Sequence, residues 1–286
     1  MSRYLRFGII ALVAVLASAV TFAPVAAQPA VPELILATTT STQDSGLLDV
    51  LIPAFQDQTG YVVKTISVGT GQAMALGERG EADVLLVHAP DSEKKWMAAG
   101  HGIDRRVVMY NDFVIVGPPS DPIGLAGATS AVEAMQKIAA NAGTFISRGD
   151  NSGTNQLELK LWKDAAFDPK GQPWYQEAGQ GMGAVLTIAS EKEGYTITDR
   201  GTYLARKATL DLEILAEGYK TFLNVYHVMV VNPDKGSHIN VEGAQAFADF
   251  VVAPATQEMI GKFGVEKFGQ PLFFPAATMT DEELGV

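Results

Sequence analysis

The sequence predicts an α/β fold in which short apolar strands alternate with amphipathic helices and form a mostly parallel sheet covered by helices on both sides. Residues 84–87 are an apolar run of strand length, short enough to be buried on both faces. Residues 61–68 are rich in β-branched side chains, as strands are. Leu47, Leu51 and Phe55 recur at helical spacing, which predicts a helix between strands.

The same criteria, applied along the chain, place the remaining elements. Strands are expected at residues 34–37, 61–68, 84–87, 107–116, 144–146, 195–198 and 224–231. Helices are expected at residues 47–55, just after Gly71, and at 131–140, 154–164, 183–192, 241–252 and 255–263. The tail after Phe274 is expected to be an irregular acidic end.

Two long strands are candidates for crossings between two lobes. The strand at 107–116 stops at the Gly-Pro-Pro sequence of residues 117–119, and the strand at 224–231 stops at an Asn-Pro pair. We expect lobe one to contain residues 28–116 and 226–286, and lobe two residues 117–225. Two such crossings would form a hinged cleft. The alternative is one continuous α/β domain.

The first 27 residues have the pattern of a cleaved signal peptide. Arg3 and Arg6 precede an apolar run at 7–20, and small residues end at Ala27. The run is shorter than the ~20 residues that span a membrane. The chain has no cysteine, so a lipid anchor on a cysteine is not expected. We therefore expect a free periplasmic protein of 259 residues.

The composition argues against several classes of partner. The formal net charge is −11, and would be −13 without Arg3 and Arg6, which disfavours nucleic acid and anionic membranes. The four histidines are scattered without metal-ligand spacing. We expect no cofactor and no protein-ligated metal ion.

Three segments share one design, in which a strand runs into a turn rich in hydroxyl groups or glycine and a helix starts there. They are residues 38–42, 69–71 and 147–154. Each offers free N–H groups at the positive end of a helix, which is a ready anion site. Ordinary helix capping is the alternative for any one segment. Strand ends in such sheets converge on one crevice, so we expect the three turns to meet.

Arg148 is the one basic residue embedded in such a turn. A guanidinium offers a fixed fork of donors that matches an oxyanion. The alternative role of Arg148 is a surface ion pair with Asp150.

The sequences Thr-Thr-Thr-Ser at 38–41, Ser-Arg-Gly-Asp-Asn-Ser-Gly-Thr at 147–154 and the segment 82–89 resemble the tungstate-binding proteins of ABC importers, the TupA type. The resemblance covers nearly the whole chain after residue 27. It implies a two-lobed type II periplasmic binding protein fold with the anion in the cleft between lobes. The ligand residues that it implies are Thr40, Ser41, Thr70, Arg148, Ser152, Gly153 and Thr154, with Thr39, Gly71, His88 and Ser147 as further candidates.

The segment 148–154 also resembles the loop of phosphate-binding proteins, which place an aspartate five residues after another Asp to accept the phosphate proton. Here the position five residues after Asp83 is His88. Histidine can donate a hydrogen bond, whereas a carboxylate would repel a deprotonated dianion. This difference argues against phosphate and for tungstate, molybdate or sulfate. The sequence leaves the choice between tungstate and molybdate open.

The function implied by the resemblance is capture of tungstate, WO4²⁻, and its delivery to an ABC permease with its ATPase. The alternative is a molybdate- or sulfate-binding protein of the same fold. We expect a monomer that meets the membrane only through the permease. An enzyme is disfavoured because residues 149–153 are not a nucleophile elbow, and no phosphate-binding Gly-Lys-Ser/Thr loop is present. The role of Arg200, as an ion pair with a carboxylate that helps to join the lobes or as a helix cap, stays open.

Overall fold

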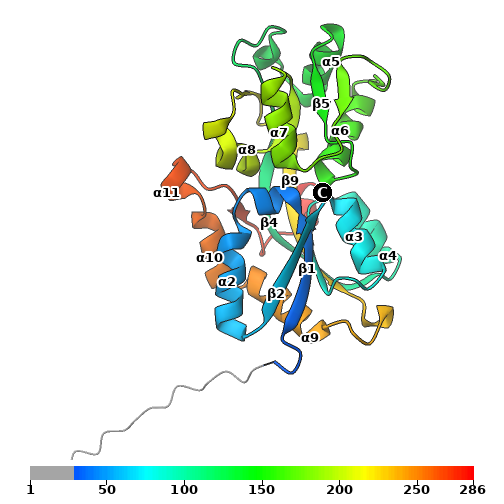
Figure 1. The fold of residues 1–286 in the computed structure, drawn as a ribbon, viewed down its shortest axis with the longest axis vertical. Coiled ribbons are helices and arrows are strands. Elements are labelled where there is room, and N and C mark those ends of the chain that lie inside the picture. Colours follow the sequence, from blue (N-terminus) through cyan, green and yellow to red (C-terminus); the bar gives the residue numbers. More distant parts are fainter. Residues whose placement is uncertain (1–28) are drawn as a thin grey trace, which may run out of the picture.

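The computed structural model describes residues 29–286, so the predicted signal segment 1–27 lies outside the described residues. Figure 1 shows two parts stacked along the long axis. We call the lower part the base (residues 29–112 and 223–286) and the upper part the cap (residues 113–222). Within residues 29–286, no helix combines the length and apolar character needed to cross a membrane.

The base is built around one sheet. Its strands are β1 (Glu33–Thr39), β2 (Val62–Val68), β3 (Val84–Val87), β4 (Gly102–Gly117), β9 (Leu223–Val231) and β10 (Phe274–Pro275). They lie in the order β10-β4-β9-β3-β1-β2. β1 runs parallel to both β2 and β3, whereas β9 runs antiparallel to β3 and β4.

Helices cover both faces of this sheet, as Figure 1 shows for α2 and α10 against α3 and α4. The helices of the base are α1 (Thr40–Asp44), α2 (Leu48–Thr59), α3 (Thr70–Glu78), α4 (Pro90–Ala98), α9 (Val241–Val252), α10 (Pro254–Lys262), α11 (Val265–Phe268), α12 (Asp281–Leu284) and the 3-10 turn η4 (Pro233–Lys235). In β3, Val84 and Leu86 join the core under α2 and α9. Leu85 and Val87 join the core under α3 and α4, so β3 is buried on both faces as predicted.

The cap has its own two buried clusters. Its elements are η1 (Leu125–Gly127), α5 (Ala131–Ala140), β5 (Phe145–Ser147), α6 (Gly153–Asp164), β6 (Tyr175–Glu177), α7 (Met182–Glu191), β7 (Thr196–Asp199), α8 (Arg200–Arg206), η2 (Lys207–Thr209), β8 (Glu213–Ala216) and η3 (Lys220–Phe222). One cluster includes Ile115 and Trp162, and the other includes Val116 and Leu186. The buried members of both clusters come from residues 113–222 alone.

β4 belongs to both parts. Its first stretch, up to Asp112, pairs with β9, and its last stretch, from Phe113, pairs with β7 and β8. The Gly-Pro-Pro sequence at 117–119 therefore marks the end of β4. It does not mark the point where β4 enters the cap. That point is set by which partner strand each residue meets.

Two expectations about the fold need correction. The mostly parallel sheet holds for β1 with its neighbours and for β5 with β6, but β4 and β9 run antiparallel to their partners. An apolar strand carries no mark of its direction, which tertiary packing decides. The tail after Phe274 is also not irregular, because Thr280 and Glu283 form a reciprocal capping box that starts α12, and Leu284 is buried.

The other predicted elements are confirmed to within a few residues at their ends. The helices at 131–140 and 241–252 and the strand at 84–87 have the predicted bounds. Sequence reasoning missed α1, α4, α8, α11 and the short strands β6, β8 and β10. These elements are short or carry few apolar residues, so their periodicity is weak.

Candidate functional site

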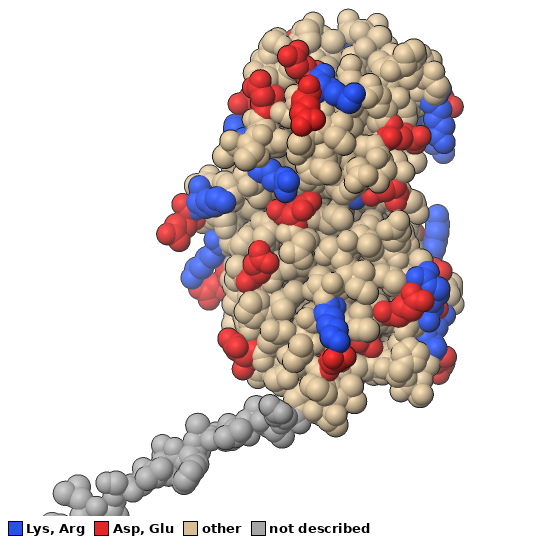
Figure 2. All heavy atoms as spheres, in the orientation of Figure 1, with Lys and Arg blue, Asp and Glu red and all other residues tan. Residues whose placement is uncertain are grey.

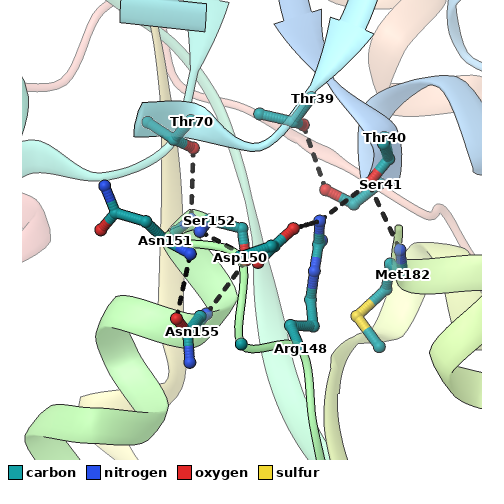
Figure 3. A network of polar contacts seen from close by, with 12 residues as sticks. Thr39, Thr40, Ser41, Thr70, Arg148, Asp150, Asn151, Ser152, Asn155 and Met182 are labelled. Atoms are coloured by element: carbon teal, nitrogen blue, oxygen red, sulfur yellow. Dashed lines mark hydrogen bonds and ion pairs between the residues drawn. The ribbon is translucent and has the colours of Figure 1, made fainter. Parts of the chain in front are cut away.

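The three predicted turns meet where the base and the cap face each other (Figure 3). The first turn contacts the third where the Arg148 Nη2 donates to Thr40 Oγ1 at 3.1 Å. The second turn contacts the third where the Gly153 N–H donates to Thr70 Oγ1 at 3.3 Å. The ends of β1, β2 and β5 thus bring their following helices together, as convergence of strand ends predicted.

Helix capping explains part of these turns. Thr39 caps α1 by accepting the Thr42 N–H at 3.3 Å, and Ser152 caps α6 by accepting the Asn155 N–H at 3.2 Å. The start of α3 has no side-chain cap, because Gly69 stands at its N-cap position. Capping therefore accounts for Thr39 and Ser152, but not for Arg148 or Thr154.

Arg148 supplies the charge of the site from a buried position, since only 2% of the residue is exposed. Its Nη2 pairs with Asp150 Oδ2 at 2.5 Å, so the predicted pair exists but lies inside the protein and not on its surface. Within residues 29–286, its Nε and Nη1 have no hydrogen-bond partner. Buried donors are nearly always paired, so these two N–H groups point to a bound acceptor.

Thr154 adds a second donor of the same kind. The residue is 2% exposed, and its Oγ1 finds no partner among the described residues. It lies in the first turn of α6, where main-chain N–H groups and the positive end of the helix dipole also favour an anion.

His88 contacts the site through Ser41. Its Nε2 lies 3.2 Å from Ser41 Oγ. Burial, together with the nearby charge of Arg148, lowers the pKa of His88 to about 3, so the imidazole is neutral at physiological pH. His88 therefore brings no positive charge to an anion.

Of the other candidate ligand residues, Gly71 contacts the third turn and Ser147 holds that turn from the side away from the site. Gly71 lies against the third turn, where its N–H donates to the Asn151 carbonyl at 3.3 Å. Ser147 is turned away, because its hydroxyl donates to the buried Glu158 at 2.6 Å. Burial raises the pKa of Glu158. Its carboxyl group holds the residue before Arg148 in place through the Ser147 hydroxyl.

Sequence reasoning missed one segment of the site. The N–H of Met182, the first residue of α7, donates to Thr40 Oγ1 at 3.3 Å. Gly181 packs closely here, because an added Cβ would lie 3.1 Å from Thr40 Cγ2. The N-cap Gly181 offers no side-chain hydrogen bond, and the first two N–H groups of α7 donate to Thr40 and to Asp44 Oδ2 at 2.8 Å, so this helix start packs against α1 of the base. The glycine-rich run at 179–183 was a usable signal, but it was interpreted only as a turn and helix start.

Arg200 lies away from these donors. It is the first residue of α8, and it pairs with Asp112 at 2.6 and 2.7 Å and with Glu217 at 2.6 Å. Its contact with Asp112 is the main cause that raises the pKa of its guanidinium. Of its two open roles, the ion pair is the one that the structure bears out, and it ties α8 to β4.

We call the donors of Arg148 and Thr154, with the helix starts around them, the donor cluster. A cavity of about 420 Å³ lies beside it. His88, Phe113, Gly153 and Asn224 form part of its wall. Arg148 is not among its lining residues, so the cavity and the donor cluster share a wall but are distinct.

The surface contributes little of the site's charge. Figure 2 shows Lys and Arg interspersed with Asp and Glu over the visible face. Among residues 29–286, no group of three or more His, Cys, Asp or Glu side chains is arranged to hold a metal ion. The donor cluster suits an anion through N–H and O–H groups.

Comparisons with known proteins show the family to which the chain belongs. Residues 23–255 match the model of the PBP superfamily domain. The tungstate-binding protein TupA of Peptoclostridium acidaminophilum is 51% identical over 246 residues, covering 85% of this chain and 86% of that protein. The structure of the tungstate ABC transporter from Geobacter sulfurreducens is 52% identical with a TM-score of 0.74, covering 81% of this chain and 98% of that chain.

A second solved structure gives the same result. The tungstate-binding protein TupA from Desulfovibrio alaskensis G20 is 45% identical with a TM-score of 0.71, and the match covers 86% of this chain and 99% of that chain. Both the sequence and the arrangement of elements are therefore shared over most of the molecule. The chain belongs to the TupA-type family of tungstate-binding proteins, within the PBP superfamily.

Proposed function

We propose that this protein binds tungstate as the WO4²⁻ dianion and delivers it to the permease of an ABC importer, which works with its own ATPase. The observation that carries the proposal is a set of buried donor atoms that have no partner among residues 29–286, near the starts of four helices. These atoms are Nε and Nη1 of Arg148 and Oγ1 of Thr154. The named function of the relatives supports tungstate as the ligand.

The donors can hold the anion without a metal ion. A hydrogen bond to a charged group contributes ~1.5–3 kcal/mol, so five of them give roughly 7–15 kcal/mol before the costs of association. Binding at 1 μM requires about 8 kcal/mol, which lies within this range. Nε and Nη1 of Arg148 and the Thr154 hydroxyl are three such donors, and we expect main-chain N–H groups at the converging helix starts to add to them.

The choice among oxyanions depends on whether the anion keeps a proton at neutral pH and on the size of the anion. Both oxygens of Asp150 are engaged, one by Arg148 and one by the Ser152 N–H at 3.1 Å. An anion that keeps a proton at neutral pH, such as phosphate, would therefore find few free acceptors in the site. Molybdate resembles tungstate in charge and size, and it is the alternative ligand, together with the smaller sulfate.

Binding, without catalysis, is the proposed activity. Ser152 is the hydroxyl that most resembles a nucleophile in the motif, but its Oγ caps α6 through the Asn155 N–H. A serine nucleophile needs a base within hydrogen-bond reach. Among the described residues, His88 contacts Ser41 and not Ser152, and Asp150 accepts from the Ser152 N–H and not from its hydroxyl.

The base and the cap are proposed to act as two lobes that close on the anion. The separate cores support this proposal, as do β4 and β9, which run between them. The core clusters favour a first boundary near residue 112 and a second near 222, a few residues before the expected 116 and 225. Ion pairs and hydrogen bonds across the interface, such as the Gly183 N–H to Asp44 at 2.8 Å, would then form on closure.

The ABC importer context also supports export. We propose that residues 1–27 direct the chain to the periplasm, where a monomer docks on the permease. Relatives named for ABC transporters support this placement.

Calorimetric titration of the purified protein with tungstate, molybdate, sulfate and phosphate tests the proposal. We expect 1:1 tungstate binding with weak or undetectable binding of sulfate and phosphate. A clear preference for sulfate or phosphate over tungstate, or no binding of any of the four anions, would refute the proposed ligand.

A further inference from the structure

A buried chain of polar side chains lies beneath the donor cluster. Asn111 on β4 and Asn224 on β9 are register partners, and the Asn224 Nδ2 donates to Asn111 Oδ1 at 2.8 Å. The Asn111 Nδ2 then donates to Asp199 Oδ1 at 3.3 Å. All three residues are at most 2% exposed, and they join the end of β7 in the cap to the two strands that connect it with the base.

The carboxylate of Asp199 determines which atoms donate and which accept in this series of hydrogen bonds. Its carboxylate accepts hydrogen bonds from the Thr202 N–H and the Thr202 Oγ1, both at 2.8 Å, as well as from Asn111. An ionised carboxylate can only accept, so the amide N–H of Asn111 must face it. Asn111 then turns its oxygen to the N–H of Asn224, and this leaves Asn224 Oδ1 at the far end.

Asn224 Oδ1 and His88 Nδ1 are left together at that end. Neither atom has a hydrogen-bond partner of good geometry among the described residues, both are buried, and both side chains form the wall of the same cavity. The Asn224 side chain also opposes the lowering of the His88 pKa by burial and by Arg148, as an acceptor near the ring would. Two buried neighbours that both need a partner are expected to satisfy each other.

We propose that the hydrogen bonds from Asp199 through Asn111 to Asn224, which we call the relay, hold His88 as the Nδ1–H tautomer. In this tautomer Nδ1–H is directed at Asn224 Oδ1, and Nε2 accepts the hydroxyl proton of Ser41. The Ser41 hydroxyl is then turned toward His88 and away from the ligand. On the basis of the proposed anion binding, Ser41 serves the anion through its main-chain N–H at the start of α1, and His88, Asn224 and Asn111 are positioning residues.

The contacts of Ser41 agree with this role. Its Oγ is 3.1 Å from Thr39 Oγ1 and 3.2 Å from His88 Nε2. Its carbonyl oxygen lies 3.1 Å from Thr202 Oγ1, whose single proton is shared between this oxygen and Asp199 Oδ2 at 2.8 Å. Ser41 is therefore held from the base and from the cap at once, which fixes the direction of the first N–H groups of α1.

The tautomer can be measured directly by two-dimensional NMR of protein carrying ¹⁵N-labelled histidine, with His88 assigned by comparison with His88→Gln. We expect a protonated Nδ1 and an unprotonated Nε2 in the wild type, and a shift toward the Nε2–H form in Asn224→Leu. A wild-type His88 protonated at Nε2 would overturn the proposal, whether or not Asn224→Leu folds.

The role of Ser41 is tested by tungstate titration of Ser41→Ala beside Arg148→Ala. We expect Ser41→Ala to weaken binding by less than about threefold, and Arg148→Ala by at least tenfold. Equal losses in the two variants would show that the Ser41 hydroxyl binds the anion, and would overturn this part of the inference. Wild-type protein that binds no tungstate would instead refute the proposed function, while the NMR result would still judge the relay.

Discussion

At the residue scale, Arg148 is the charge on which the site depends. It is the cation of the donor cluster, and one carboxylate, that of Asp150, pairs with it at 2.5 Å. Its remaining N–H groups are fixed in direction because the guanidinium is planar and the side chain is packed inside the protein. A point charge on a flexible stem, such as lysine, would not reproduce this fork.

Arg148→Ala is expected to weaken tungstate binding by at least tenfold, because two charge-assisted hydrogen bonds are lost. The variant also leaves the partly buried Asp150 without its cation, so its free energy of unfolding is measured by urea titration alongside the calorimetry. Arg148→Lys keeps the charge but not the fork, so its tungstate affinity should lie between those of Arg148→Ala and the wild type. Unchanged affinity in folded Arg148→Ala would remove the main anchor of the proposed site.

His88 gives the protein a defined pH dependence. Its folded pKa of about 3 lies below the value of 6.5 for a free imidazole, so at pH 5 the unfolded chain binds a proton that the folded protein does not. The free energy of unfolding therefore falls as the pH falls below 6.5, by about 2 kcal/mol between pH 7 and pH 5 for this residue.

Urea unfolding of the wild type and His88→Gln at pH 7 and pH 5 isolates this effect. Burial raises the pKa of Asp199 to about 6, and this group acts in the opposite direction, but it is present in both proteins. The wild type should lose more stability than His88→Gln on acidification. Parallel losses would mean that His88 is protonated, or solvated, in the folded protein.

At the element scale, the site is made of helix starts more than of side chains. The starts of α1, α3, α6 and α7 lie together, and two of them have glycine at the N-cap. Glycine permits the close approach of neighbouring backbone at these points. Gly153, the first residue of α6, lies against His88 of the β3 end, where an added Cβ would be 2.8 Å from the His88 carbonyl oxygen.

Gly153→Ala should therefore push the start of α6 away from β3. We expect an affinity loss of at least tenfold and a stability loss of about 1–3 kcal/mol from overpacking. Gly127→Ala is the matched control, since its Cβ would meet only the flexible end of Lys137, at 3.4 Å. Calorimetry and urea unfolding of both variants make the test, and similar behaviour of the two would contradict the close packing at Gly153.

At the scale of the whole molecule, the base and the cap touch through residues of the site and through residues beside it. Thr40 of the base contacts both Arg148 and Met182 of the cap, and Ser92 of α4 donates to Gln156 of α6 at 2.6 Å. In the proposed hinged protein, these contacts would belong to the closed form. An anion at this interface would stabilise closure, because it would bind donors from both parts.

Small-angle X-ray scattering should show a smaller radius of gyration in saturating tungstate than in its absence. Arg148→Ala at the same anion concentration should show no such change, which separates ligand-driven closure from a general salt effect. Superimposable profiles for the wild type with and without tungstate would count against a hinge.

The sequence by itself determined the local features of this protein. Apolar periodicity placed most helices and strands, since burial selects residues every second or every third to fourth position. The turns at 38–42, 69–71 and 147–154 could be recognised because strand ends followed by helix starts have a chemistry of their own. Arg148 could be singled out because a cation inside such a turn has few other uses.

Only the tertiary structure decided what depends on partners far apart in the sequence. The antiparallel direction of β4 and β9, the fourth helix start at Met182 and the turning of Ser147 toward Glu158 all result from packing between distant segments. The neutral state of His88 depends on burial and on Arg148, sixty residues further along the chain. Hydrogen-bond direction and pKa are properties of an environment, and a sequence specifies that environment only through the completed fold.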